Sequence, residues 1–155
     1  MKKKKIVVDA SIAVKWILKE ADSSTAVALL TEWTDREDIE LLAPTLLAYE
    51  VTNVLHRHIR TGDLPFDDAR KGLKEIIFKA IDFEFSPDAS LNTRAMELAQ
   101  QFGLSAAYDV HYLAFAEYKG CELWTADTRF WNSIKGKLDR VRWMGDYPTP
   151  QDKEI

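Results

Sequence analysis

The sequence predicts an α/β fold in which a mostly parallel sheet is covered on both faces by helices. Short apolar segments alternate along the chain with longer segments whose apolar residues recur at helical spacing, which is typical of strand–helix–strand units. The first short segment, residues 6–8, is a continuous Ile-Val-Val run, as expected of a strand buried on both faces. The 155 residues contain no repeat and no linker-like stretch, so we expect a single domain.

In the first half of the chain, cap and turn residues mark where helices begin and end. Ser11 is a favoured helix N-cap, Pro44 is a good first helical residue, and Thr61-Gly62 is a helix stop. Between these signals, apolar residues at helical spacing or in short runs define the elements. The expected strands span residues 6–8 and 39–43, and the expected helices span residues 11–17, 23–33, 44–60 and 65–80.

The alternation continues through the second half of the chain. Residues 81–85 alternate apolar and charged side chains, as a strand with one solvated face does. Gly103 and Gly120 end the helices that we expect over residues 88–102 and 106–118. Strands over residues 121–125 and 141–144, with a helix over 128–138 between them, complete a domain placed at residues 1–146 and followed by a loose tail over 147–155.

The composition is that of an ordinary globular protein. Hydrophobic residues make up 46% and charged residues 30%, and no run approaches the roughly 18 apolar residues of a membrane span. A net charge of −4 excludes a histone-like polycation, so a nucleic-acid partner would need a local basic surface or bound cations. The apolar run after Lys5 is too short for a signal peptide and Cys121 is the single cysteine, so we expect a cytoplasmic protein without a membrane partner.

Three aspartates fall where a parallel sheet binds its ligands. In such sheets, ligands bind beyond the carboxyl ends of the strands. Asp9 follows the first strand directly, Asp127 follows the strand that ends at Thr125, and Asp109 lies in the first turn of a helix. Each of them alone is explained as well by helix capping, because aspartate is favoured at helix starts.

Glu50 is harder to explain by local structure. It lies three residues after Leu47 and four before Val54, so it projects from the apolar face of its helix. A buried carboxylate costs several kcal/mol unless a cation, a hydrogen-bonding shell or a proton compensates it. The alternative is a structural ion pair with an Arg or Lys from elsewhere in the chain.

The four acids together indicate a metal site. Two carboxylates about 6 Å apart repel each other by roughly 3 kcal/mol at an effective dielectric constant of about 20. Four such groups at one edge of the sheet would destabilise the fold unless cations lay among them. Carboxylate oxygens suit Mg²⁺ or Mn²⁺ better than Zn²⁺, and such ions activate water for attack on a phosphodiester. We therefore expect hydrolysis of a nucleic-acid backbone.

Four segments of the sequence, taken in order, resemble the acidic motifs of PIN-domain ribonucleases. Order, spacing and chain length are similar to those of VapC-type toxins of toxin–antitoxin modules, and the resemblance covers about residues 6 to 145. The segments are Val-Val-Asp-Ala-Ser-Ile-Ala-Val-Lys-Trp-Ile at residues 7–17, Pro-Thr-Leu-Leu-Ala-Tyr-Glu-Val-Thr-Asn-Val-Leu at 44–55, Leu-Ser-Ala-Ala-Tyr-Asp-Val-His-Tyr-Leu-Ala-Phe-Ala at 104–116, and Leu-Trp-Thr-Ala-Asp-Thr-Arg-Phe at 123–130.

The resemblance implies a three-layer α/β/α sandwich and a Mg²⁺- or Mn²⁺-dependent endoribonuclease. It implies that Asp9 and Asp109 hold metal most directly, and that Glu50 and Asp127 assist through waters or a second ion. It also implies an RNA substrate, a cognate antitoxin and a homodimer that joins two acidic edges into one groove. The pair Val110-His111 departs from the small residue that relatives often carry after the third acid, which puts the shape of the RNA groove in question.

Four polar residues near the acids are candidates for a supporting role. Ser11 could hydrogen-bond a metal-bound water or the phosphate, and its alternative role is a helix cap. Asn53 lies one turn after Glu50 and could orient it, or it simply faces solvent. Thr125 lies close to Asp127 in sequence, and Arg129 could touch phosphate or form a surface salt bridge.

Three other functions remain open from the residues. An RNase H-like nuclease also uses four acids, but its fold opens with three consecutive antiparallel strands. A phosphate-accepting or phosphatase domain would need an Asp-x-Asp or adjacent acidic pair after the first strand, where this chain has Asp9-Ala10-Ser11. A binding module that kept the PIN fold and lost catalysis is the non-enzymatic alternative.

Overall fold

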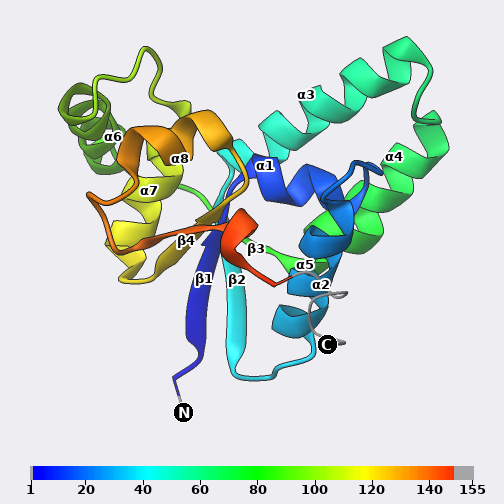
Figure 1. The fold of residues 1–155 in the computed structure, drawn as a ribbon, viewed down its shortest axis with the longest axis horizontal. Helices are drawn as coiled ribbons and strands as arrows, with labels where there is room; N and C mark the ends of the chain where they lie inside the picture. Colours follow the sequence, from blue (N-terminus) through cyan, green and yellow to red (C-terminus); the bar gives the residue numbers. More distant parts are fainter. Residues whose placement is uncertain (1, 149–155) are drawn as a thin grey trace.

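The computed structural model describes residues 2–148 and places a five-stranded sheet between two layers of helices (Figure 1). The strand order is β3-β2-β1-β4-β5, and every pair of neighbouring strands is parallel. The predicted α/β/α sandwich is therefore confirmed. The strands are β1 (Lys4–Val8), β2 (Ile39–Pro44), β3 (Asp82–Glu84), β4 (Glu122–Thr125) and β5 (Val141–Trp143).

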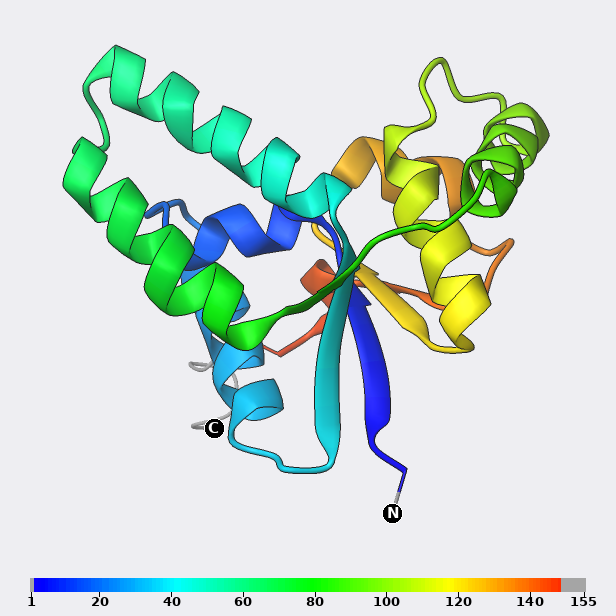
Figure 2. The ribbon, with the colours of Figure 1, turned by 180° about the vertical axis from the view of Figure 1, so that it is seen from behind.

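The helices divide between the two faces of the sheet. Helices α1 to α5 cover one face and α6 to α8 cover the other, as the two opposite views show (Figures 1 and 2). The α-helices are α1 (Ala10–Ala13), α2 (Ser23–Thr34), α3 (Leu46–Thr61), α4 (Phe66–Gly72), α5 (Phe78–Ala80), α6 (Ser90–Gln101), α7 (Tyr108–Lys119) and α8 (Thr128–Ile134). Short 3-10 turns lie at η1 (Val14–Trp16) and η3 (Met144–Asp146), and a π-helical segment, η2 (Leu73–Ile77), joins α4 to α5.

The core lies on both sides of the central strand β1. Val7 and Val8 are fully buried, because β1 is covered by helices on both faces and flanked by β2 and β4. Helix α7 packs across β1, β2 and β4, and buries Val110 and Leu113. The helix that carries Asp109 is thus fixed directly over the central strand.

Pro44 does not open a helix, as we predicted, but ends a strand. It is the last residue of β2, opposite Glu84 of β3, and α3 begins two residues later at Leu46. Proline has no N–H to give to a ladder, and the end of a strand is a place where that missing donor costs little. The predicted stop was right, since Gly62 caps α3 with a φ of 86°.

Two predicted helices differ in their extent. The helix predicted over 65–80 is interrupted by η2, and the one predicted over 128–138 already ends at Ile134. In the first case the chain closely approaches Ile17, the residue that follows η1: a Cβ on Gly72 would lie 2.8 Å from its side chain. This contact explains why a glycine stands inside that helical stretch.

The carboxyl ends of the parallel strands share one edge of the sheet. There, β1 continues into Asp9 and β4 continues towards Asp127. At the other end of the chain, Tyr147 was expected in a loose tail, but its ring packs against Trp124 at 6.4 Å. Residues 149–155 of the expected tail lie outside the described residues. Among residues 2–148, no helix combines the length and apolarity needed to cross a membrane.

Candidate functional site

Asp9 and Asp127 follow the ends of two paired strands, and both cap helices. The Oδ1 atom of Asp9 accepts the N–H of Ile12 at 3.4 Å, at the start of α1. The Oδ1 atom of Asp127 accepts the N–H of Phe130 at 3.0 Å, at the start of α8. Capping is therefore a real role of both residues, and it engages one oxygen of each.

Asp109 lies in the first turn of α7 but does not cap it. The residue at the N-cap is Ala107, and no side chain accepts a capping hydrogen bond there. Helix capping, the alternative role considered for all three aspartates, therefore fails for this one. Only the favourable electrostatics of an acid near a helix start remain as a structural role for Asp109.

Glu50 projects from α3 and meets a phenol instead of a cation. Its Oε1 atom accepts the hydroxyl of Tyr112 at 2.5 Å. Within residues 2–148, none of Asp9, Glu50, Asp109 and Asp127 forms an ion pair with lysine or arginine. The alternative of a structural ion pair for Glu50 is thus not supported. We call these four acids the carboxylate rim.

The pKa shifts show that the carboxylate rim centres on Asp109. Burial raises the pKa of Asp109 to about 6, and the negative charges of Asp127 and Glu50 contribute to the increase. Burial also raises the pKa of Asp9 to about 7, against the opposing hydrogen bonds from Ser11, Thr125 and Ile12, and the negative charge of Asp109 adds a smaller increase. The charge of Asp109 therefore interacts with all three other acids.

The side chains of the carboxylate rim are of the type that binds hard cations, but they do not form a complete set of metal ligands by themselves. Within residues 2–148, no three acidic, histidine or cysteine side chains converge closely enough to form a ready-made metal site. The donors are nonetheless all carboxylate oxygens, and no lysine or arginine of the described residues forms an ion pair with them. Such a set fits Mg²⁺ or Mn²⁺, whose remaining ligands are commonly waters and substrate phosphate oxygens.

A hydroxyl pair connects the ends of β1 and β4. Ser11 Oγ donates to Asp9 Oδ1 at 2.5 Å, accepts the N–H of Ala126 at 2.8 Å, and lies 3.4 Å from Thr125 Oγ1. Thr125 Oγ1 in turn accepts the N–H of Asp127 at 3.1 Å. Ser11 and Thr125, which the sequence singled out, thus fix the two strand-end acids relative to each other.

Asn53 and Arg129, the other two candidates, lie differently. Both are exposed, and neither forms a hydrogen bond or ion pair with an acid of the rim among the described residues. The group that contacts Glu50 is Tyr112, which sequence reasoning missed. The available signal was a tyrosine one turn after Asp109, in an otherwise apolar buried run.

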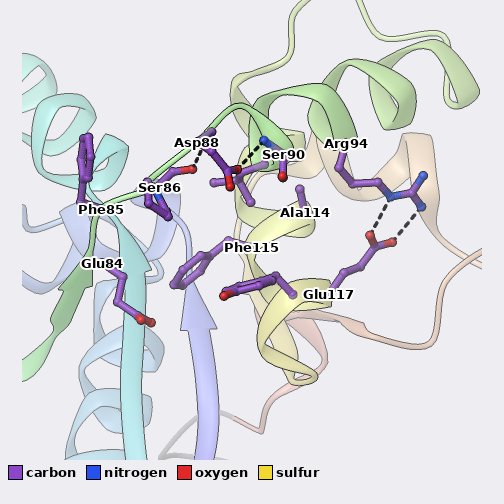
Figure 3. A pocket seen from close by; sticks show the side chains of 12 residues that line it. Glu84, Phe85, Ser86, Asp88, Ser90, Arg94, Ala114, Phe115 and Glu117 are labelled. Carbon is purple, nitrogen blue, oxygen red and sulfur yellow. Dashed lines mark hydrogen bonds and ion pairs between the residues drawn. The ribbon is translucent and has the colours of Figure 1, made fainter.

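A separate hollow of about 600 Å³ lies beside the carboxyl-terminal half of α7 (Figure 3). None of the rim acids lines it. Two of its charged residues pair with each other: Arg94 donates from Nε and Nη2 to both oxygens of Glu117, at 2.8 and 3.1 Å. We call it the α7 hollow, and its walls include Glu84, Phe85, Leu91, Arg94, Phe115, Glu117 and Tyr118.

Comparisons with known proteins agree with this geometry. A family model described as the PIN domain matches residues 6–134. Ribonuclease VapC3 of Pyrobaculum aerophilum is 34% identical over 125 residues, which cover 79% of this chain and 89% of the relative.

Two solved structures share the fold. VapC20 of Mycobacterium tuberculosis, a Sarcin-Ricin loop cleaving toxin, has a TM-score of 0.64 at 19% identity, covering 86% of this chain and 97% of that one. A toxin–antitoxin complex from Klebsiella pneumoniae contains a chain with a TM-score of 0.58 at 14% identity, covering 88% and 95%. By sequence and by fold, the chain belongs to the PIN domain family, among its VapC-type members.

Proposed function

We propose that this protein is a divalent-metal-dependent endoribonuclease and the toxin of a toxin–antitoxin pair. The observation that carries the proposal is the carboxylate rim, in which Asp109 interacts with three other acids and no lysine or arginine of residues 2–148 neutralises them. Uncompensated acids in a partly buried site are typical of groups that bind a cation or substrate. Family membership and the 34% identity to Ribonuclease VapC3 support the same activity.

The acids have distinct tasks in this proposal. Asp9 and Asp109 hold Mg²⁺ or Mn²⁺ most directly, and Glu50 and Asp127 assist through waters or a second ion. Such an ion supplies Lewis-acid polarisation of the phosphodiester and lowers the pKa of the attacking water. Ser11 donates to the carboxylate of Asp9, and Thr125 accepts the backbone N–H of Asp127, so these two hydroxyls hold the acids in place at the strand ends.

No histidine stands ready as a general base at the rim. His111 is two residues after Asp109, but its Nδ1 donates to the carbonyl of Ala107 at 2.6 Å and its Nε2 lies 3.2 Å from Asn92 Nδ2. Both ring nitrogens are thus engaged. Activation of water therefore falls to the cation and its carboxylates.

The proposed partners follow from the relatives. One solved relative is described as a Sarcin-Ricin loop cleaving toxin and another as part of a toxin–antitoxin complex. We propose an RNA substrate, a cognate antitoxin, a cytoplasmic location and a homodimer that joins two rims into one longer groove. The competing function is a PIN-fold binding module without catalysis, favoured by the absence of a ready-made three-ligand group among residues 2–148.

An RNA-cleavage assay with the isolated protein tests the proposal. Wild-type protein should cleave RNA in the presence of Mg²⁺ or Mn²⁺, and cleavage should stop when a chelator is added. Asp9→Asn should lower kcat/KM by about a thousand-fold, because it removes several kcal/mol of metal-dependent stabilisation of the transition state. Asp139→Asn, at an exposed position, is the matched control. Equal activity of wild type and Asp9→Asn would overturn the mechanism, and no cleavage by either would favour the binding module.

A further inference from the structure

Tyr112 joins the two helices that carry rim acids. It lies on α7, one turn after Asp109, and its side chain is 1% exposed. Its hydroxyl donates to Glu50 Oε1 at 2.5 Å, and Glu50 belongs to α3. A single residue of α7 therefore contacts an acid that is 62 positions away in the sequence.

This hydrogen bond gives the Tyr112 hydroxyl an acceptor and the Glu50 carboxylate a donor. A buried phenol hydroxyl normally finds an acceptor, and here the acceptor is charged, which makes the hydrogen bond short and strong. Within the described part of the chain, Glu50 has no lysine or arginine beside it and no second hydrogen bond. The orientation of its carboxylate is therefore set by Tyr112.

The bond also gives the two carboxylate oxygens of Glu50 different surroundings. Oε1 is engaged by the phenol, whereas Oε2 accepts no hydrogen bond from residues 2–148. Because Tyr112 and Asp109 occupy successive turns of one helix, the position of Glu50 is tied to that of Asp109.

We propose that Tyr112 is a positioning residue for the metal site: its hydroxyl holds Glu50 by Oε1 and leaves Oε2 for the cation or a water bound to it. The inference rests on the proposed function, because it concerns the same carboxylate rim. Groups that orient a ligating carboxylate typically change metal affinity or activity by 10- to 100-fold when they are removed. A purely structural hydroxyl would change stability and leave cation affinity unchanged.

Calorimetric titration with Mn²⁺, in the absence of RNA, tests this role. Tyr112→Phe keeps the buried ring and removes the hydroxyl, and it should weaken Mn²⁺ binding by about 10- to 100-fold. Tyr118→Phe is the matched control, since Tyr118 lies on the same helix with a side chain that is 79% exposed, and it should bind Mn²⁺ as the wild type does. Circular-dichroism melting of each variant reports whether the fold is retained.

A double-mutant cycle with Glu50→Gln separates positioning from packing. If Tyr112 acts through Glu50, Tyr112→Phe should cause no further loss of Mn²⁺ affinity in the Glu50→Gln background. A further loss there, or unchanged affinity in Tyr112→Phe alone, would overturn the inference. If Tyr112→Phe alone does not fold, a further loss of Mn²⁺ affinity in the Glu50→Gln background still overturns the inference.

Different results would refute the proposed function and the role of Tyr112. A wild-type protein that neither binds Mn²⁺ nor cleaves RNA would refute the proposed function. A wild type that does both, beside a Tyr112→Phe variant with unchanged Mn²⁺ affinity, would refute only the role of Tyr112.

Discussion

Helix α7 carries two acids in opposite electrostatic surroundings. Asp109, in its first turn, interacts with three other carboxylates, and no lysine or arginine of residues 2–148 pairs with it. Glu117, two turns later, is held by both nitrogens of an arginine fork from Arg94 on α6. The same helix thus belongs to the carboxylate rim at one end and to the α7 hollow at the other.

The difference teaches which acids serve the fold. In the α7 hollow, Glu117 pairs with Arg94, and Glu84 accepts from Lys119 at 2.6 Å, so both of these glutamates have a cationic partner. In the rim, burial and repulsion raise the pKa values of Asp9 and Asp109, which means that their charged forms destabilise the metal-free fold. The charged forms of these two acids therefore cost stability near neutral pH in the metal-free fold, and a cation-dependent function accounts for that cost.

The largest expected effect is on RNA cleavage, and it appears when one acid at each end of α7 is neutralised in separate variants. Asp109→Asn should lower kcat/KM for RNA cleavage by about a thousand-fold, because it removes a group proposed to hold the cation directly. Glu117→Gln, the matched change in the α7 hollow, should leave kcat/KM within about two-fold, since it lies outside the rim. Comparable losses in the two variants would erase the distinction between the regions.

The pH dependence of stability sharpens the comparison. Asp9 has a pKa of about 7 in the folded protein and about 3.9 when unfolded, so the folded state binds more protons between these values. The titration of Asp9 should therefore lower the free energy of unfolding of the metal-free protein by about 3 kcal/mol as the pH rises from about 4 to about 7.

Denaturant unfolding at several pH values, with chelator present, measures this contribution. Asp9→Asn should be more stable than the wild type at pH 7 and should have a flatter pH profile. The stability of Glu117→Gln should depend on pH as that of the wild type does. Adding Mn²⁺ to the wild-type protein should raise its stability near pH 7, because a cation favours the charged carboxylates. Identical pH profiles for wild type and Asp9→Asn would show that Asp9 titrates normally.

The smallest effect is expected from the ion pair of the α7 hollow. Arg94→Ala should lower the free energy of unfolding by at most about 1 kcal/mol, because its side chain is 42% exposed and solvent screens the pair. RNA cleavage and Mn²⁺ affinity should not change. A loss of cleavage in a variant that remains folded would connect the α7 hollow to the rim and break the comparison.

Local sequence patterns predicted most of the fold. Strand–helix alternation and glycine stops gave the order of the elements and the parallel sheet, since these signals depend on neighbouring residues only. The errors lie at element ends. Pro44 suits the start of a helix and the end of a strand equally well, and the pairing of β2 with β3 decided for the strand.

The candidate site was predictable to a similar degree. Asp9 and Asp127 followed from their positions after predicted strands, and Glu50 from the apolar face of its helix. The role of Tyr112 did not follow from any pattern. Its partner depends on how α7 packs against α3, and those helices are far apart in the sequence.

The sequence by itself determined which acids exist, on which elements they stand and at which edge of a parallel sheet two of them emerge. Only the tertiary structure decided that the charge of Asp109 acts on the other three acids, that Glu50 pairs with a phenol, and that Glu117 pairs with an arginine. The reason is physical: periodicity and caps act over a few residues, whereas ion pairs, repulsion and burial depend on distances in space. Those distances are set by strand order and helix packing, which bring residues of distant segments together.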